Sequence, residues 1–337
     1  MKREAKTIIL IGALLPALIS PAPAPAGGPG LSTVRFATTG RVGTDWHFFV
    51  AKERRIFQKN GIYVEDIIIQ GAPNATRAVI SNTVPLGRIN PDFVVDAIEK
   101  GAKVRIISGD MGKIPYDLMA RPEIQSGTDL RGKIIGVSSL TGGTTLMVKE
   151  VLERAYKLTD KDYQLLVVGT SPDRYAALKG GSVAATFMAP PFNIRAQREG
   201  YRKLVTFHEV LGPIQFVASF AHEDYLRSNR PQVVGYVKSM IEATRWLYDG
   251  KNKEEAIAIY TGLLKTTREA AETDYRFLVE EFKPWPADGS VNPQAMEKTM
   301  ELRVKAGRYE GKKAPSYTQY ADLSIVEEAK RDLGQQP

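Results

Sequence analysis

The chain has 337 residues, no cysteine and a formal charge of +8. This length is more than one hydrophobic core usually supports, so about 310 residues without disulfides are expected to form two lobes. The lack of cysteine excludes disulfides, thiolate nucleophiles, cysteine metal sites and a lipid-modified cysteine. Basic and acidic residues are interleaved, and no basic stripe carries regular aromatic residues, so a nucleic-acid partner is not expected.

The first thirty residues have the order of an export signal. Three basic residues precede the apolar run Ile8 to Ile19, and the small-residue tract Pro21 to Gly30 follows it. The run contains Pro16 and is too short to span a bilayer as a helix, which disfavours a permanent anchor. We expect cleavage after Ala26 (signal peptide 1–26), which leaves Gly27 as the first residue of a soluble, monomeric, periplasmic protein with a charge of +6.

Strands alternate with helices in the first part of the mature chain. The periodicity predicts strands over 33–39, 62–70, 83–89 and 103–108, and helices over 44–59, 74–81 and 91–100. The last of these helices opens with a proline, which suits the first helical position. This alternation predicts an α/β unit with a parallel, doubly wound sheet.

A second round of the same alternation begins near residue 117. Strands are predicted over 117–120, 133–138, 163–168 and 184–188, and helices over 144–156, 172–179 and 192–198. A return strand is predicted over 214–220, and from residue 223 onward the pattern is helical. Periodicity leaves two arrangements open: two domains in series, or two lobes with the helical tail returning to cover the first.

An ordered series of short segments carries a family resemblance. The segments are FATTG (36–40), IFQKNGIYVEDI (56–67), AIEKGAKVRIISG (97–109), DLRGKIIGVSS (129–139), RYAALKGGSVAATFMAPP (174–191) and AQREGYRKL (196–204). In this order they resemble the type II periplasmic binding proteins of the nitrate, sulfonate and taurine transporter group, which share a domain with thiamine-pyrimidine synthases. The resemblance covers about residues 34–220.

The resemblance implies a fold and a domain arrangement. It implies two α/β lobes with a double crossover, the chain passing between them near Gly112 to Tyr116 and His208 to Gln215, plus a helical C-terminal region. Lobe 1 would then comprise 27–113 and 213–337, and lobe 2 would comprise 114–212.

The resemblance also implies a function. The chain would be the extracytoplasmic solute-binding component of an ABC importer, holding a small-molecule solute between the lobes and delivering it to a membrane permease and ATPase complex. Two alternatives stay open: an enzyme on the same fold, either pyrimidine-synthase-like or menaquinone-pathway-like, and an exported sensory binding module. The synthases use a cysteine-rich motif and work in the cytosol, whereas this chain has no cysteine and an expected export signal, so both features disfavour a synthase.

Candidate ligand contacts lie where strands end and helices begin. The tract SSLTGGTT between a strand and a helix offers backbone and hydroxyl donors for an anion, although an ordinary helix cap has the same composition. Ligands in open α/β sheets bind beyond the carboxyl ends of the strands. The candidates are Thr38, Thr39, Trp46, His47, Ser138, Ser139, Gly142, Gly143, Thr144, Thr145, Met188 and Pro190.

The segment NTVPLGRINPDF (82–93) departs from the family pattern. The family usually has an acidic residue here, whereas this chain places Arg88 and Asn90 where family members often touch the ligand. We therefore expect an anionic solute held jointly by Arg88 and the helix start at Gly143 to Thr145. The alternative is that Arg88 faces solvent or pairs with Asp92.

Metal and cofactor chemistry have no support in the sequence. The three histidines are far apart in sequence and none has a metal-binding spacing, and no Gly-x-Ser-x-Gly elbow or nucleotide loop is present. No catalytic residue, metal or cofactor is therefore expected.

Overall fold

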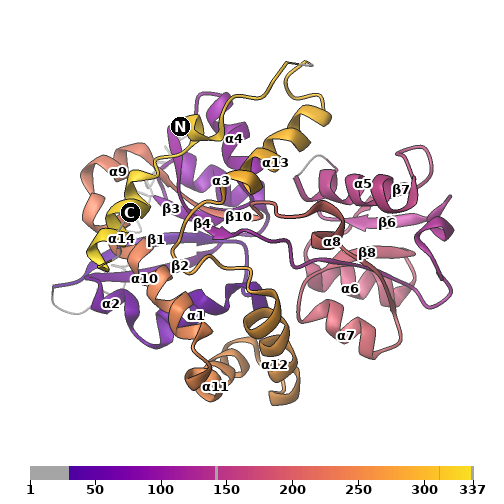
Figure 1. Ribbon diagram of the computed structural model, residues 1–337, viewed down its shortest axis with the longest axis horizontal. Helices are drawn as coiled ribbons and strands as arrows, with labels where there is room; N and C mark the ends of the chain where they lie inside the picture. Colours follow the sequence, from indigo (N-terminus) through magenta and orange to yellow (C-terminus); the bar gives the residue numbers. More distant parts are fainter. Residues whose placement is uncertain (1–29, 141–142, 311, 335–337) are drawn as a thin grey trace, which may run out of the picture.

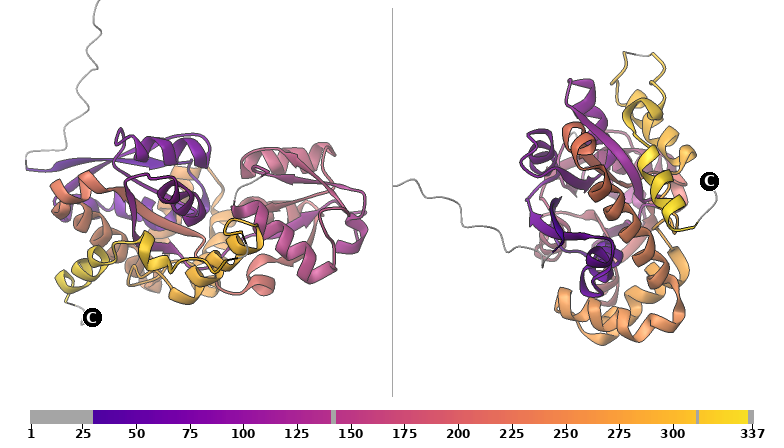
Figure 2. Two further views of the ribbon diagram at one scale, coloured as in Figure 1. Left: turned by 90° about the horizontal axis from the view of Figure 1, so that it is seen from above. Right: turned by 90° about the vertical axis from the view of Figure 1, so that its left-hand side faces the viewer.

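The computed structural model describes residues 30–140, 143–310 and 312–334. It contains two five-stranded sheets that lie in two lobes (Figures 1 and 2). The two-lobe α/β fold predicted from the sequence is thereby confirmed. The expected signal peptide and its cleavage point lie outside the described residues.

Sheet A forms the centre of lobe 1 in the order β2-β1-β3-β10-β4. Its strands are β1 (Ser32–Thr38), β2 (Ile62–Ile68), β3 (Leu86–Ile89), β4 (Val104–Met111) and β10 (Val217–His222). Strand β1 pairs in parallel with β2 and β3, while β10 runs antiparallel between β3 and β4.

Sheet B forms the centre of lobe 2 in the order β7-β6-β8-β5-β9. Its strands are β5 (Asp117–Ala120), β6 (Ile134–Val137), β7 (Gln164–Val167), β8 (Ala185–Met188) and β9 (Arg202–Thr206). Strand β5 runs antiparallel between β8 and β9. In each sheet the antiparallel strand is the first one after the chain has crossed from the other lobe, so the two crossings enter the sheets in equivalent ways.

Helices cover both sheets. In lobe 1 before the first crossing they are η1 (Gly43–Asp45), α1 (Trp46–Glu53), α2 (Ile56–Lys59), α3 (Ala72–Ile80) and α4 (Pro91–Glu99). In lobe 2 they are η2 (Gly127–Leu130), α5 (Gly143–Tyr156), α6 (Ser171–Gly180), α7 (Phe192–Arg198) and α8 (Phe207–Leu211). In the parts of the chain that the structure describes, no helix is both long and apolar enough to cross a membrane.

The chain after β10 is helical and packs mainly on lobe 1 (Figure 1). Its helices are α9 (Glu223–Ser228), α10 (Arg230–Tyr248), η3 (Gly250–Asn252), α11 (Lys253–Leu264), α12 (Arg268–Tyr275), η4 (Arg276–Phe282), α13 (Pro293–Lys305), η5 (Tyr317–Tyr320) and α14 (Ser324–Asp332). Tyr236 of α10 stacks on Phe36 of β1 with ring centroids 5.0 Å apart. Helix α13 is tied to α4, because the buried Arg303 donates to Asp92 and, at 2.8 Å, to Asp96. We propose 27–113 with 213–337 and 114–212 as the boundaries of the two lobes.

The structure differs from the prediction in three respects. The sheets are mixed and not parallel as predicted, because β10 and β5 each run antiparallel to both neighbours. The single helix expected over 44–59 is interrupted at Arg55, whose left-handed backbone (φ 56°) separates α1 from α2. Strand β9 was not predicted, because this edge strand begins with two exposed basic residues, Arg202 and Lys203, and shows little apolar alternation.

Candidate functional site

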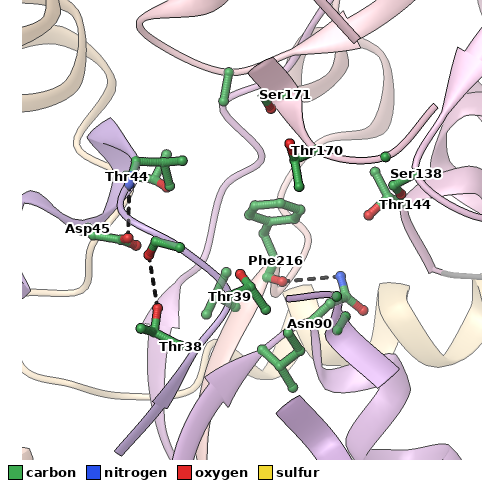
Figure 3. Close-up of a pocket in the computed structure, with 18 of the residues that line it drawn as sticks. Thr38, Thr39, Thr44, Asp45, Asn90, Ser138, Thr144, Thr170, Ser171 and Phe216 are labelled. Carbon is green, nitrogen blue, oxygen red and sulfur yellow. Dashed lines mark hydrogen bonds between the residues drawn. The ribbon is translucent and has the colours of Figure 1, made fainter. Parts of the chain in front are cut away.

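A cleft of about 310 Å³ lies between the lobes, at the carboxyl ends of parallel strands from both sheets (Figure 3). Lobe 1 contributes the ends of β1 and β3 and the segment from Val42 to Asp45, and lobe 2 contributes the turns after β6, β7 and β8. The crossings contribute Tyr116 and Phe216, so two of the three aromatic side chains that line the cleft lie where the lobes are joined. Open α/β sheets bind ligands at this position.

The lobe 1 wall is held in place by local hydrogen bonds. The Thr38 hydroxyl donates to the Gly40 carbonyl at 3.1 Å. Asn90 caps α4 by accepting from the backbone N–H of Asp92 at 3.0 Å, and its amide donates to the Phe216 carbonyl at 3.1 Å. Asn90 therefore ties the end of β3 to the second crossing, as the dashed line in Figure 3 shows.

Arg88 lies in a buried group of charged side chains, which we call the Arg88 cluster: Asp45, His47, Arg88 and Asp110. The guanidinium of Arg88 donates to Asp110 at 3.1 Å and also to Asp45. Asp110 in turn lies 3.3 Å from Nε2 of His47. The positive charge of Arg88 is thus neutralised by two carboxylates of its own lobe.

Burial and pairing act in opposite directions on the pKa values of this cluster. Burial opposes the charged form of Asp110, but Arg88 and then His47 outweigh it, so the pKa of Asp110 is lowered. Burial raises the pKa of Asp45 despite the attraction of Arg88. Burial also lowers the pKa of His47, so this imidazole is neutral near pH 7. Arg88 is therefore paired within its own lobe and is not free to bind an anionic solute.

The lobe 2 wall consists mainly of hydroxyl side chains at the starts of two helices and at the end of one strand. Ser138 follows β6 and Thr144 lies in the first turn of α5, whereas Thr170 and Ser171 form the start of α6. Figure 3 shows Thr170 and Ser171 on one side of Phe216, with Thr38 and Thr39 on the other. The carboxylate of Asp173 accepts from the backbone N–H of Thr170 at 2.9 Å and from the Thr170 hydroxyl at 2.5 Å. These two hydrogen bonds fix the backbone at the start of α6.

The structure brings eight of the predicted contact residues to the cleft. They are Thr38, Thr39, Arg88, Asn90, Ser138, Ser139, Thr144 and Pro190. Gly143 lies at the contact of the two lobes, where a Cβ would come within 2.8 Å of Oδ1 of Asn90. Gly142 lies outside the described residues.

Four other candidates lie away from the cleft. Trp46 is fully buried, stacks on Tyr260 at 3.9 Å and donates to the Ala256 carbonyl. His47 belongs to the Arg88 cluster, the Thr145 hydroxyl donates to the Ser139 carbonyl at 2.5 Å, and Met188 packs in the core of lobe 2. Arg88 does not face solvent, because it is buried. It does not pair with Asp92 either, because Asp92 pairs with Arg303.

Sequence reasoning missed several cleft residues, chiefly Tyr116, Thr170, Ser171, Arg174 and Phe216. The two aromatic residues lie on the crossings, where no periodic pattern marks them. A signal for Arg174 was present: it follows Ser-Pro-Asp at the predicted start of a helix, where the helix dipole disfavours a cation. In the described ranges no three His, Asp or Glu side chains could hold a metal ion together.

Solved structures share this two-lobe architecture. The alkanesulfonate-binding protein SsuA from Xanthomonas axonopodis pv. citri, bound to MOPS, is 17% identical, with 88% of this chain and 100% of that chain covered and a TM-score of 0.69. The periplasmic nitrate-binding protein NrtA from Synechocystis PCC 6803 is 15% identical, with 90% and 89% covered and a TM-score of 0.69. The desulfurization enzyme DSZB also has this fold, at 13% identity, 89% and 99% coverage and a TM-score of 0.63.

The sequence itself matches one family model over most of the two lobes. The match runs from residue 46 to residue 253, and the model is described as NMT1/THI5 like. It includes both crossings, the whole of lobe 2 and the first three helices of the tail, α9, α10 and η3. The resemblance noted from the ordered segments is thereby confirmed, and the chain belongs to the NMT1/THI5-like family.

Proposed function

We propose that this chain is the solute-binding component of an ABC importer and that it captures a small anionic solute between its lobes. The observation that carries the proposal is the cleft itself, which is lined by both lobes and both crossings. Its volume of about 310 Å³ suits a small molecule, and its wall combines hydroxyl groups with the aromatic rings of Tyr116, Phe216 and Phe93. The mature protein would act as a periplasmic monomer and deliver the solute to a permease and ATPase complex.

An enzyme on the same fold is the second candidate, since DSZB shares the architecture. Hydroxyl nucleophiles need an adjacent base. The described residues that line the cleft include no histidine, lysine or cysteine, and Asp45 is bound to Arg88. This composition supports binding rather than turnover.

A thermal-shift screen of the mature protein tests the proposal, because a ligand that binds only the folded state raises the melting midpoint. The panel contains nitrate, butanesulfonate, benzenesulfonate, benzoate and neutral heterocycles. We expect at least one anion to raise the midpoint and to be recovered chemically unchanged after incubation. Conversion of the solute would favour the enzyme, and a response to neutral compounds alone would contradict an anionic solute.

Closure around the solute is the expected mechanical consequence. The crossings contain Gly112, where an added Cβ would meet no atom within 4 Å, and Gly212, which has a φ of 72°. Such short connections can absorb a hinge motion between lobes. Small-angle scattering should show a smaller radius of gyration with saturating solute, and an unchanged value would contradict the clamp.

A further inference from the structure

Arg174 is a buried cation in the wall of the cleft. It lies in the first turns of α6, lines the cleft from lobe 2, and only 2% of its surface is exposed. Three arginines are buried among the described residues: Arg88, Arg174 and Arg303. Arg88 contacts two carboxylates and Arg303 contacts three, but no carboxylate in the described ranges forms an ion pair with Arg174.

Neutral groups alone satisfy the Arg174 guanidinium. Nε donates to the Phe187 carbonyl at 3.0 Å, Nη2 donates to the Ser171 hydroxyl at 3.0 Å, and Nη1 donates to the Gly169 carbonyl. The guanidinium carbon lies 3.9 Å from the centre of the Phe187 ring. These contacts orient the guanidinium, and the Tyr116 phenol also hydrogen-bonds to it, but none of these groups supplies a negative charge.

Nearby titratable groups do not supply the missing charge. Burial raises the pKa of Tyr116 although Arg174 partly offsets it, so the phenol is neutral near pH 7. Asp173 attracts Arg174 only through space, and its carboxylate is bound by Thr170. Burial accordingly lowers the pKa of Arg174. A buried cation without a carboxylate at bonding distance is costly, and this one borders the space in which a solute would lie.

We propose that Arg174, and not Arg88, supplies the positive charge that binds the anionic group of the solute. This inference rests on the proposed function and adds the side chain responsible for the preference for anions. A carboxylate or sulfonate at the start of α6 would neutralise the charge of Arg174 and would lie at the positive end of the helix dipole. The aromatic side chains of Tyr116 and Phe216 would contact the rest of the solute.

Calorimetric titration of three variants tests this assignment. Arg174→Gln removes the charge, Arg174→Lys keeps it without the planar fork, and Lys179→Gln is the control, an exposed cation on the same helix that does not line the cleft. The probes are nitrate, butanesulfonate, benzenesulfonate and benzoate, with benzenesulfonamide and benzamide as neutral counterparts. We expect Arg174→Gln to weaken anion binding roughly ten- to a hundredfold and Lys179→Gln to change it less than about twofold.

The melting midpoint without solute separates a binding role from a structural one. Arg174→Gln removes a buried charge but also three hydrogen bonds, so its melting midpoint should stay close to that of the parent. Arg174→Lys should keep the preference for anions with reduced affinity. The assignment is wrong if Arg174→Gln binds the anions as tightly as the parent, or if Arg174→Lys loses its preference for them. If the parent itself binds none of the anions, the proposed anionic solute fails first, and the role of Arg174 fails with it.

Discussion

The two walls of the cleft each contain a buried arginine, and the two arginines differ in what neutralises them. On lobe 1, Arg88 is bound by Asp45 and Asp110, and His47 extends the group. On lobe 2, Arg174 is bound by two backbone carbonyls and a hydroxyl. An arginine at a cleft is therefore available to an anionic ligand only if carboxylates of the protein have not already neutralised its charge.

The largest expected effect is on stability, and it separates the two arginines. Arg88→Met leaves Asp45 and Asp110 buried without a cation, so the free energy of unfolding should fall by about 3–5 kcal/mol. Urea unfolding measures this, with Arg77→Met on the exposed side of α3 as a control expected to stay within about 0.5 kcal/mol of the parent. If Arg88→Met unfolds at the same urea concentration as the parent, the Arg88 cluster does not have the structural role described.

A buried carboxylate extends the comparison to the opposite charge. Asp274 of α12 has no cation partner at bonding distance among the described residues; its Oδ2 accepts from Tyr260 at 2.6 Å, and its Oδ1 has no hydrogen-bond partner. Burial raises its pKa to about 6, whereas the pKa of the paired Asp110 is lowered. The folded protein thus holds the Asp274 proton more tightly than the unfolded chain does. The stabilisation that this proton gives the folded state is present below pH 4 and is lost as the pH rises through about 6.

The substitution Asp274→Asn should remove that pH dependence. At pH 8 the variant should be more stable than the parent by about 1–3 kcal/mol, and at pH 4 the difference should nearly vanish. Urea unfolding at both pH values measures it, and Glu272→Gln on the same helix is the control. Equal stability of Asp274→Asn and the parent at pH 8 would contradict an unpaired, buried carboxylate.

The smallest expected effect concerns a contact between the lobes. Lys305 of α13 donates to Glu150 of α5 at 2.7 Å, and Glu150 also accepts from Arg154. Because Arg154 remains, Lys305→Met should lower the free energy of unfolding by only ~0.2–1 kcal/mol. Its control is Lys298→Met, whose partner Glu301 lies on the same helix.

Solute binding by Lys305→Met shows whether the contact between the lobes or the charge of Arg174 limits the affinity for anions. If the charge of Arg174 governs the preference for anions, this variant should keep it, with an affinity within about threefold of the parent, equivalent to less than about 1 kcal/mol. Calorimetry with the tightest anion of the panel measures the affinity. A loss greater than tenfold would show that the contact between the lobes, rather than the charge in the wall, limits binding.

The sequence was sufficient for the parts of the fold that depend on local periodicity. The strands that end at the cleft were predicted because apolar runs and turn residues mark them. Thr38 and Ser138 were predicted as contacts from the ends of these strands, and Thr144 was predicted from the start of the following helix. Edge strand β9 was missed because it is short and begins with basic residues.

Local periodicity could not predict which of the two cleft arginines is neutralised by carboxylates. The partners of Arg88 come from positions 45 and 110, and those of Arg174 come from the ends of β7 and β8 and from the start of α6. Only the three-dimensional arrangement shows which arginine is neutralised. The sequence therefore singled out the arginine at the strand end and passed over the one inside a helix.

A crystal structure of the mature protein with the tightest anion of the panel tests the central claim most directly. We predict that the solute lies between the lobes, with its anionic group within hydrogen-bonding distance of the Arg174 guanidinium, and that Arg88 keeps its bonds to Asp45 and Asp110. A solute whose anionic group is bound by Arg88, or one that lies outside the cleft, would contradict the account.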